Sequence, residues 1–228
     1  MHFPYRLIDC THTLGEATPS WDGSCGFHCE VNLDYQDCTE EVKFKVQKLK
    51  MHAGIGTHID APAHCCPQGM TVDQIDLASL IAPCVVIDIS DRAHESYQLT
   101  EEDIEYFEKQ RGRIQPGVFV FVRTGWEKYW GDSHKYRNNQ CFPSVSKSAA
   151  LVLLQRKIVG LGIDTLSPDR PGTGFPVHQI ILGAGRYLIE NAANLAQVPV
   201  VGSMIIVAPM KIQGGTEAPI RLLCLIPE

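Results

Sequence analysis

The sequence has no long apolar run and no cluster of basic residues. None of its apolar stretches approaches the roughly 18 residues that a membrane-spanning helix requires. Its 20 Lys and Arg residues are outnumbered by 26 Asp and Glu residues, which gives a formal net charge of −6. Nucleic acids and anionic membrane surfaces are therefore poor candidate partners. Residues 1–6 lack the apolar core of a secretory leader, so we expect a cytoplasmic location.

The sequence also lacks the marks of a disulfide-stabilised or multi-domain protein. Its nine cysteines are an odd number, which predicts free thiols in a reducing compartment. Cys25, Cys29 and Cys38 are an incomplete zinc motif, because a fourth ligand with regular spacing is missing. No internal repeat, low-complexity tract or Pro/Gly/Ser-rich linker interrupts the 228 residues. We therefore predict a single domain over residues 1–228.

Apolar strand-like segments alternate with amphipathic helix-like segments. The predicted strands cover residues 5–13, 84–89, 117–123, 158–163, 204–207 and 220–226. The predicted helices cover residues 146–157, residues 176–183, and a segment opened by Thr100 and Asp103, which resemble a capping box. In that last segment Ile104 and Phe107 share the inner face. The alternation predicts an α/β fold with a mixed sheet.

Residues 42–51 show the period of a strand. Apolar side chains at positions 42, 44 and 46 alternate with polar ones, which predicts a half-buried strand. The alternation then shifts by one residue, to Leu49 and Met51. A β-bulge near Gln47 and Lys48 would produce this shift.

Residues 58–64 carry the first group of chemically active side chains. His58 and Asp60 are two residues apart, so in an extended segment both leave the same face, about 7 Å apart along the backbone. A turn at Pro62 would bring His64 back to that face. Nitrogen and carboxylate donors of this kind suit Zn²⁺ or Mn²⁺. The alternative is a buried, hydrogen-bonded His58 and a turn-capping Asp60.

His178 and Glu190 form a second group. Both are polar residues in otherwise apolar sequence, and twelve positions separate them. On a continuous helix they would lie about 120° apart, and Gly183 and Gly185 interrupt the helix in any case. Spacing alone leaves two readings open: satisfied buried polar groups, or ligands that meet where the chain folds back.

The segment from Gly56 to His64 resembles the signature of the putative-cyclase superfamily, which includes bacterial kynurenine formamidase and isatin hydrolase. That signature reads His-x-Gly-Thr-His-x-Asp-x-Pro-x-His. The resemblance continues through the segments Leu7–Thr13, Arg123–Trp126 and Gly162–Ser167, and through His178 and Glu190 with their spacing. It therefore covers nearly the whole chain.

The resemblance implies a fold, an assembly and a set of roles. The fold is a swivelling β/β/α, cyclase-like single domain with a mixed sheet, and a homo-oligomer, either dimer or tetramer, is usual. The implied metal ligands are His58, Asp60, His178 and Glu190. His64 corresponds to the general acid and base, and Trp21 to an aromatic residue that contacts the substrate.

One position departs from the family signature. The first signature His falls on Gly54, and His52 lies two residues too early to replace it in register. The remaining four ligands suffice for one ion with an open position for water. We therefore expect one divalent metal, Zn or Mn, per chain. Cys65 and Cys66 adjoin the site, and we interpret them as neighbours held by packing in preference to thiolate ligands.

The function that the resemblance implies is hydrolysis of a carbon–nitrogen bond in an amide, formamide or cyclic amide, as in an arylformamidase. A bound cation polarises the carbonyl and makes water a stronger acid. His64 would relay the proton, since its unperturbed pKa of about 6.5 lies close to neutral pH. Two alternatives stay open: a lactonase or lyase on the same metal site, and a non-catalytic metal- or ligand-binding relic of the fold.

Overall fold

The computed structural model describes residues 4–228, so the first half of the N-terminal segment that we examined for a leader lies outside the described residues. Its strands are β1 (Tyr5–Asp9), β2 (Phe27–Leu33), β3 (Val46–Met51), β4 (His58–Asp60), β5 (Ile81–Asp88), β6 (Gln98–Leu99), β7 (Phe119–Arg123), β8 (Ser144–Val145), β9 (Gly160–Ile163), β10 (Tyr187–Glu190), β11 (Ser203–Pro209) and β12 (Glu217–Pro227). Its α-helices are α1 (Glu101–Arg111), α2 (Ser133–Arg137), α3 (Lys147–Gln155) and α4 (Pro176–Gly183). Between Pro4 and Glu228, no helix has the length and apolar character needed to cross a bilayer.

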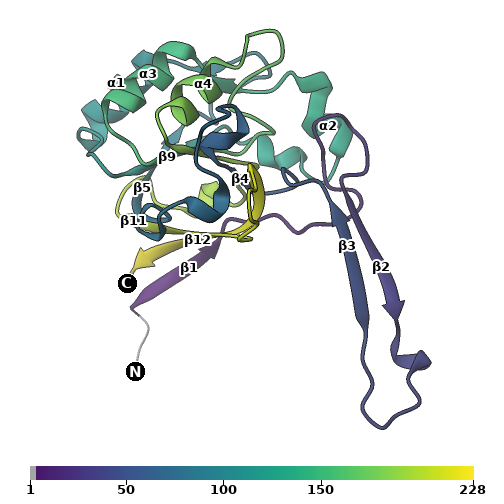
Figure 1. Ribbon diagram of the computed structural model, residues 1–228. Coiled ribbons are helices and arrows are strands. Elements are labelled where there is room, and N and C mark those ends of the chain that lie inside the picture. The colour runs from purple at the N-terminus through teal and green to yellow at the C-terminus, as the bar shows by residue number, and fades with distance from the viewer. Residues whose placement is uncertain (1–3) are drawn as a thin grey trace.

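The main sheet has eight strands and curls into a ring. Its order is β1-β12-β11-β5-β7-β9-β10-β4, and β4 also pairs with β12. The seven strands from β12 to β4 therefore close on themselves, while β1 extends the edge beyond β12 (Figure 1). Strands β5, β7, β9 and β10 run parallel to one another, whereas every pairing of β4, β11 and β12 is antiparallel. The protein thus has the predicted α/β fold with a mixed sheet, and the sheet is closed like a barrel.

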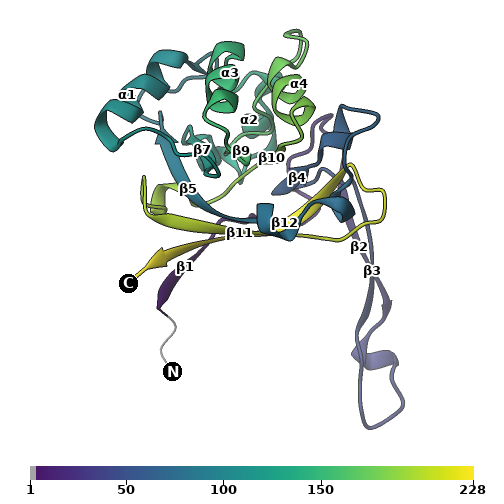
Figure 2. The ribbon, with the colours of Figure 1, turned by 60° about the vertical axis from the view of Figure 1, so that its left-hand side comes forward.

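The side chains of β7 show how the fold divides its core. Phe119 and Phe121 face the inside of the ring, whereas Val120 and Val122 face the helices. This alternation follows from the period of two along a strand. Helices α1, α3 and α4 lie together on the outer side of these parallel strands (Figure 2). Gly162 of the neighbouring strand makes room for the rings, since a Cβ there would lie 2.6 Å from Cδ1 of Phe121.

Most predicted elements are confirmed, with shifted ends. Helix α1 begins after Thr100 with a complete capping box to Asp103, and its residues Ile104 and Phe107 are buried. Helix α4 has the predicted bounds, and α3 starts at the Ser146 cap. The first strand ends at Asp9, four residues earlier than predicted, because beyond Cys10 it is the side chain of Thr11, and not its backbone, that hydrogen-bonds to Leu222 of β12.

The prediction for residues 42–51 is wrong in part. Residues 42–45 are not in a strand, and the strand that follows, β3, pairs only with β2 in a two-stranded hairpin. This hairpin projects away from the body of the protein in both views (Figures 1 and 2). The register shift lies in β2, between Val31 and Leu33, and not at Gln47 and Lys48. Alternating apolar residues indicate a half-buried strand only where a core lies beside the strand. This hairpin has no core on either face, so its apolar side chains are exposed.

Candidate functional site

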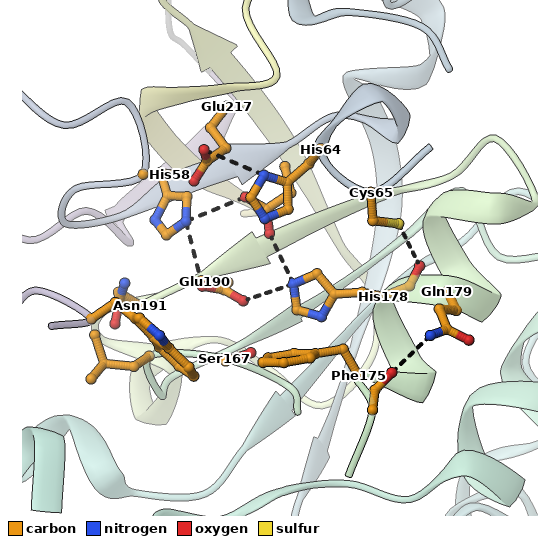
Figure 3. A pocket seen from close by; sticks show the side chains of 15 residues that line it. His58, His64, Cys65, Ser167, Phe175, His178, Gln179, Glu190, Asn191 and Glu217 are labelled. Atoms are coloured by element: carbon orange, nitrogen blue, oxygen red, sulfur yellow. Dashed lines mark hydrogen bonds and ion pairs between the residues drawn. The ribbon is translucent and has the colours of Figure 1, made fainter. Parts of the chain in front are cut away.

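Strand β4 fixes the directions of His58 and Asp60. It lies between β10 and β12, and its central residue Ile59 is fully buried in the core inside the ring. His58 and Asp60 therefore face the opposite side, as the spacing predicted. A single 3₁₀ turn, Pro62–His64, follows at once and carries His64 over the same face (Figure 3).

Helix α4 and strand β10 bring His178 and Glu190 together. Pro176 starts the helix, and Gly185 then takes a positive φ of 72°, so the chain reverses into β10. The register of β10 sets Glu190 directly opposite His58 on β4. A helix, a turn and a strand account for the spacing of twelve, and the chain does fold back on itself here.

The four predicted ligands meet in one buried cluster (Figure 3). Nε2 of His58 lies 3.4 Å from Oδ1 of Asp60 and 3.4 Å from Oε2 of Glu190. Nε2 of His178 lies 3.7 Å from Oδ2 of Asp60 and 3.5 Å from Oε1 of Glu190. Each imidazole thus faces one oxygen of each carboxylate.

Both imidazoles are held from behind by an oxygen acceptor. Nδ1 of His58 lies 2.9 Å from the carbonyl oxygen of Gly56, and Nδ1 of His178 lies 2.8 Å from Oδ2 of Asp169. Because these oxygens only accept, each Nδ1 carries a hydrogen. With Nδ1 protonated, each Nε2 faces the carboxylate oxygens, and either a proton on Nε2 or a cation bound beside it supplies the positive charge that these oxygens attract. Such hydrogen bonds behind a histidine are typical of metal ligands.

The carboxylates of the cluster are short of hydrogen bonds. Both oxygens of Asp60 and Oε1 of Glu190 are buried without a hydrogen-bond partner. Burial lowers the pKa of His178, but Asp169, Asp60 and Glu190 outweigh it and raise that pKa to about 10. Burial likewise opposes charge on His58, and the two carboxylates still raise its pKa well above the usual range. The cluster is therefore built to hold positive charge.

A divalent cation fits this donor set. The four N···O distances of 3.4 to 3.7 Å bring two imidazole nitrogens close to four carboxylate oxygens, and a divalent cation binds donors of both kinds. The donor atoms also form two compact triads that share Asp60: one with His58 and Glu190, the other with His64 and His178. Imidazole and carboxylate donors suit zinc and manganese alike.

His64 stands at the edge of the cluster beside an acidic partner. Its Nδ1 lies 3.3 Å from Oε2 of Glu217, and its side chain is 33% exposed. The Glu217 carboxylate raises the pKa of His64 above its usual value, although burial opposes this. His64 is thus more accessible than the four other residues and is available to a substrate.

A cavity of about 590 Å³ opens over the cluster. Trp21, Leu166 and Phe175 form an apolar part of its lining, and the ring centroids of Trp21 and Phe175 are 6.1 Å apart. Cys65 also lines it, but burial raises the pKa of its thiol to about 12, and its Sγ donates to the carbonyl oxygen of His178 at 3.6 Å. This favours the packing interpretation over a thiolate ligand. His52 is exposed and lies beside Gly26, so it does not replace the missing imidazole at position 54.

The sequence reasoning missed Phe175 and two acidic residues of the site, Asp169 and Glu217. Asp169 accepts from the backbone N–H groups of Val177 and His178 as well as from the His178 ring, so it caps α4 and orients a ligand at once. An acidic residue shortly before a predicted helix is a weak signal of such a cap. No sequence pattern around Glu217 indicates that it belongs to the site. Its position is set by the register of β12 against β4, which places it opposite Asp60.

Fold and site together define a mixed α/β protein whose cavity holds a cluster of imidazole and carboxylate donors, and comparisons with known sequences place it in a family. Residues 8–170 match the family described as "Putative cyclase". The isatin hydrolase of Roseibium aggregatum is 32% identical over 98% of this chain and 92% of that protein. The kynurenine formamidase of Salinibacter ruber is 25% identical over 94% of this chain and 95% of that protein. The chain belongs to the cyclase family.

Solved structures support the same conclusion. An isatin hydrolase bound to the product analogue thioisatinate superimposes with a TM-score of 0.88 at 30% identity, covering 99% of this chain and 94% of that one. A potential metal-dependent hydrolase with cyclase activity superimposes with a TM-score of 0.78 at 27% identity, covering 98% and 99%. The protein is thus a hydrolase of this family.

We predict that Asp169→Asn weakens metal binding without unfolding the protein. The amide keeps the shape of the side chain but removes the charge behind His178, and loss of such a partner typically costs 10–100-fold in metal affinity. Titration of the metal-free variant with Zn²⁺ against a fluorescent chelator measures the change. Asp132→Asn is the matched control, because Asp132 also caps a helix but lies on α2. Equal affinity in the wild type and Asp169→Asn would mean that His178 is not a ligand.

Proposed function

We propose that this protein hydrolyses the carbon–nitrogen bond of an aromatic amide, either a cyclic N-aryl amide of the isatin kind or an N-formyl arylamine. One observation carries the proposal. A cluster of two imidazoles and two carboxylates lies in a cavity that Trp21 and Phe175 line in part with aromatic surface. Flat aromatic rings bind well against such surfaces. The similarity to isatin hydrolase and kynurenine formamidase agrees with this substrate class.

The metal ligands are His58, Asp60, His178 and Glu190, and we propose one Zn²⁺ or Mn²⁺ ion per chain. When bound, the ion supplies Lewis-acid polarisation of the amide carbonyl and makes water a stronger acid. Gly54 is the reason for a single ion, because the position that carries an imidazole in the family signature has no side chain here.

His64 is the proton carrier in the proposed mechanism. It accepts a proton from the attacking water as the water oxygen bonds to the carbonyl carbon. It then gives that proton to the nitrogen as the carbon–nitrogen bond breaks, which releases a carboxylate and an amine. The two transfers leave His64 in its starting state, as a general acid and base must be. Trp21 and Phe175 hold the aromatic part of the substrate and exclude water from one side of it.

We also propose that the protein is a homo-oligomer, a dimer or tetramer, assembled through the β2–β3 hairpin. An isolated two-stranded hairpin is marginally stable in water. Its apolar side chains are between 45% and 63% exposed, which favours burial against another surface: Val31, Val42, Phe44, Val46 and Leu49. A second copy of the chain is the partner that is always present at the required concentration.

The first test of the function is metal dependence on a defined set of substrates. Metal-free protein should be inactive, and Zn²⁺ or Mn²⁺ should restore hydrolysis of isatin or formanilide, with elemental analysis giving one ion per chain. Mass spectrometry of the product should show the gain of one water and a free amine. Full activity after complete chelation would exclude the mechanism. Cleavage of aromatic lactones alone would favour the lactonase instead.

His64→Asn separates the proton carrier from the ligands. We expect the variant to keep its metal and to lose about 10²-fold or more in kcat, because asparagine exchanges no proton near neutral pH. Steady-state kinetics and elemental analysis on the same sample provide both values. Loss of the metal from a folded His64→Asn variant would make His64 a ligand and would leave the proton carrier unidentified.

The oligomer is tested by charging the hairpin. Val42→Asp combined with Phe44→Asp should convert the protein to monomers, because it puts two charges into the proposed apolar interface. Light scattering coupled to size exclusion measures the mass. Leu77→Asp is the control, because Leu77 is 76% exposed on the body of the protein and not on the hairpin. A monomeric wild type at micromolar concentration would contradict the proposal.

A further inference from the structure

The space beside Gly54 is already filled. A Cβ built at this residue would lie 2.0 Å from Oε1 of Glu217, 3.1 Å from its Cδ and 3.3 Å from Nε2 of His58. The φ of Gly54 lies outside the left-handed region, so its backbone conformation is open to any residue. The constraint at position 54 is therefore steric and comes from the Glu217 carboxylate.

Strand β12 delivers this carboxylate to the site. Glu217 is the first residue of the strand and pairs with Asp60 on β4, so the two side chains share a face. The side chain of Glu217 is 23% exposed and lines the same cavity as the metal cluster. Although Glu217 is far from the other site residues in the sequence, the pairing of β12 with β4 that closes the ring brings it to the site.

Glu217 meets His64 at one nitrogen of its ring. Oε2 of Glu217 lies 3.3 Å from Nδ1 of His64 (Figure 3), and His64 also offers a ring nitrogen to the triad that it forms with Asp60 and His178. A carboxylate at Nδ1 holds the hydrogen there and leaves Nε2 free to take a proton. His64 follows a single 3₁₀ turn and its side chain is partly exposed, so it needs an external partner to hold one orientation.

We propose that Glu217 is the positioning residue of His64, and that Gly54 is glycine because the Glu217 carboxylate occupies the space of its missing side chain. This inference rests on the proposed function of His64 as proton carrier. Residues 54 and 217 then act as a pair, in which one side chain excludes the other. It follows that Gly54→His, which supplies the imidazole of the family signature, also expels Glu217 and releases His64.

A double-mutant cycle on the metal-loaded protein tests the pair. We expect Glu217→Ala to lower kcat about 10- to 100-fold, with KM within about twofold and the metal content unchanged, because only the orientation of His64 is lost. Gly54→Ala should have the same effect, since its methyl group displaces the carboxylate. The double variant should be no worse than either single variant, because both remove one interaction. Glu217→Gln should recover part of the loss, because its amide oxygen still accepts from Nδ1.

Arg221→Gln is the matched control for these variants. Arg221 lies on the same strand and forms an exposed ion pair with Asp9, away from the cavity, so kcat should not change. Wild-type kcat in Glu217→Ala would overturn the proposal, and so would multiplicative effects in the cycle. Loss of metal from Glu217→Ala would also overturn it, because Glu217 would then be a ligand.

A second readout works without a substrate. In ¹⁵N spectra of the histidine rings, the His64 signals, assigned by their absence in His64→Asn, should move in both Glu217→Ala and Gly54→Ala. The signals of His178 should stay in both variants, and those of His58 should stay in Glu217→Ala. If the wild type hydrolyses no amide while these shifts occur, the proposed function fails and the contact between Glu217 and His64 stands. Unmoved His64 signals would overturn the contact itself.

Discussion

Strand β4 is only three residues long, and the site depends on its place between two other strands. The register that closes the ring sets Glu190 opposite His58 on one side and Glu217 opposite Asp60 on the other. A slip of one residue would turn His58 and Asp60 into the core and Ile59 into the cavity. Backbone hydrogen bonds that complete the barrel thus also set the positions of the acidic and imidazole groups.

The buried side chains of the cluster stabilise one another through their opposite charges. Asp60 and Glu190 are almost fully buried, and burying a carboxylate without a partner is costly. The imidazoles of His58 and His178 offset this charge when they are protonated, and a cation bound among the carboxylates would offset it as well. Asp169 and the Gly56 carbonyl stand behind the imidazoles and fix which nitrogen faces inward. The polar groups that surround the centre are therefore part of its electrostatics.

Local patterns in the sequence predicted much of this fold and part of the site. The capping box of α1, and Pro176 and Gly183 at the two ends of α4, are local signals, and they predicted both helices correctly. The common face of His58 and Asp60 follows from the period of a strand. The contact between Glu217 and His64 could not be predicted, because it depends on a register between strands more than 150 residues apart. The hairpin strand was misassigned because alternation indicates a buried face only where a core exists beside it.

The closed ring also bears on how the protein is made. Strand β4 appears early in the sequence, but its partners β10 and β12 come after every helix. A ribosome therefore releases His58 and Asp60 long before Glu190 and Glu217 are synthesised. Until then, β4 has neither neighbour, and the nascent chain holds an incomplete set of ligands. Long-range pairing of this kind is slow to form. The metal centre is thus assembled last, and a chain that stalls before β12 carries an open barrel without a finished site.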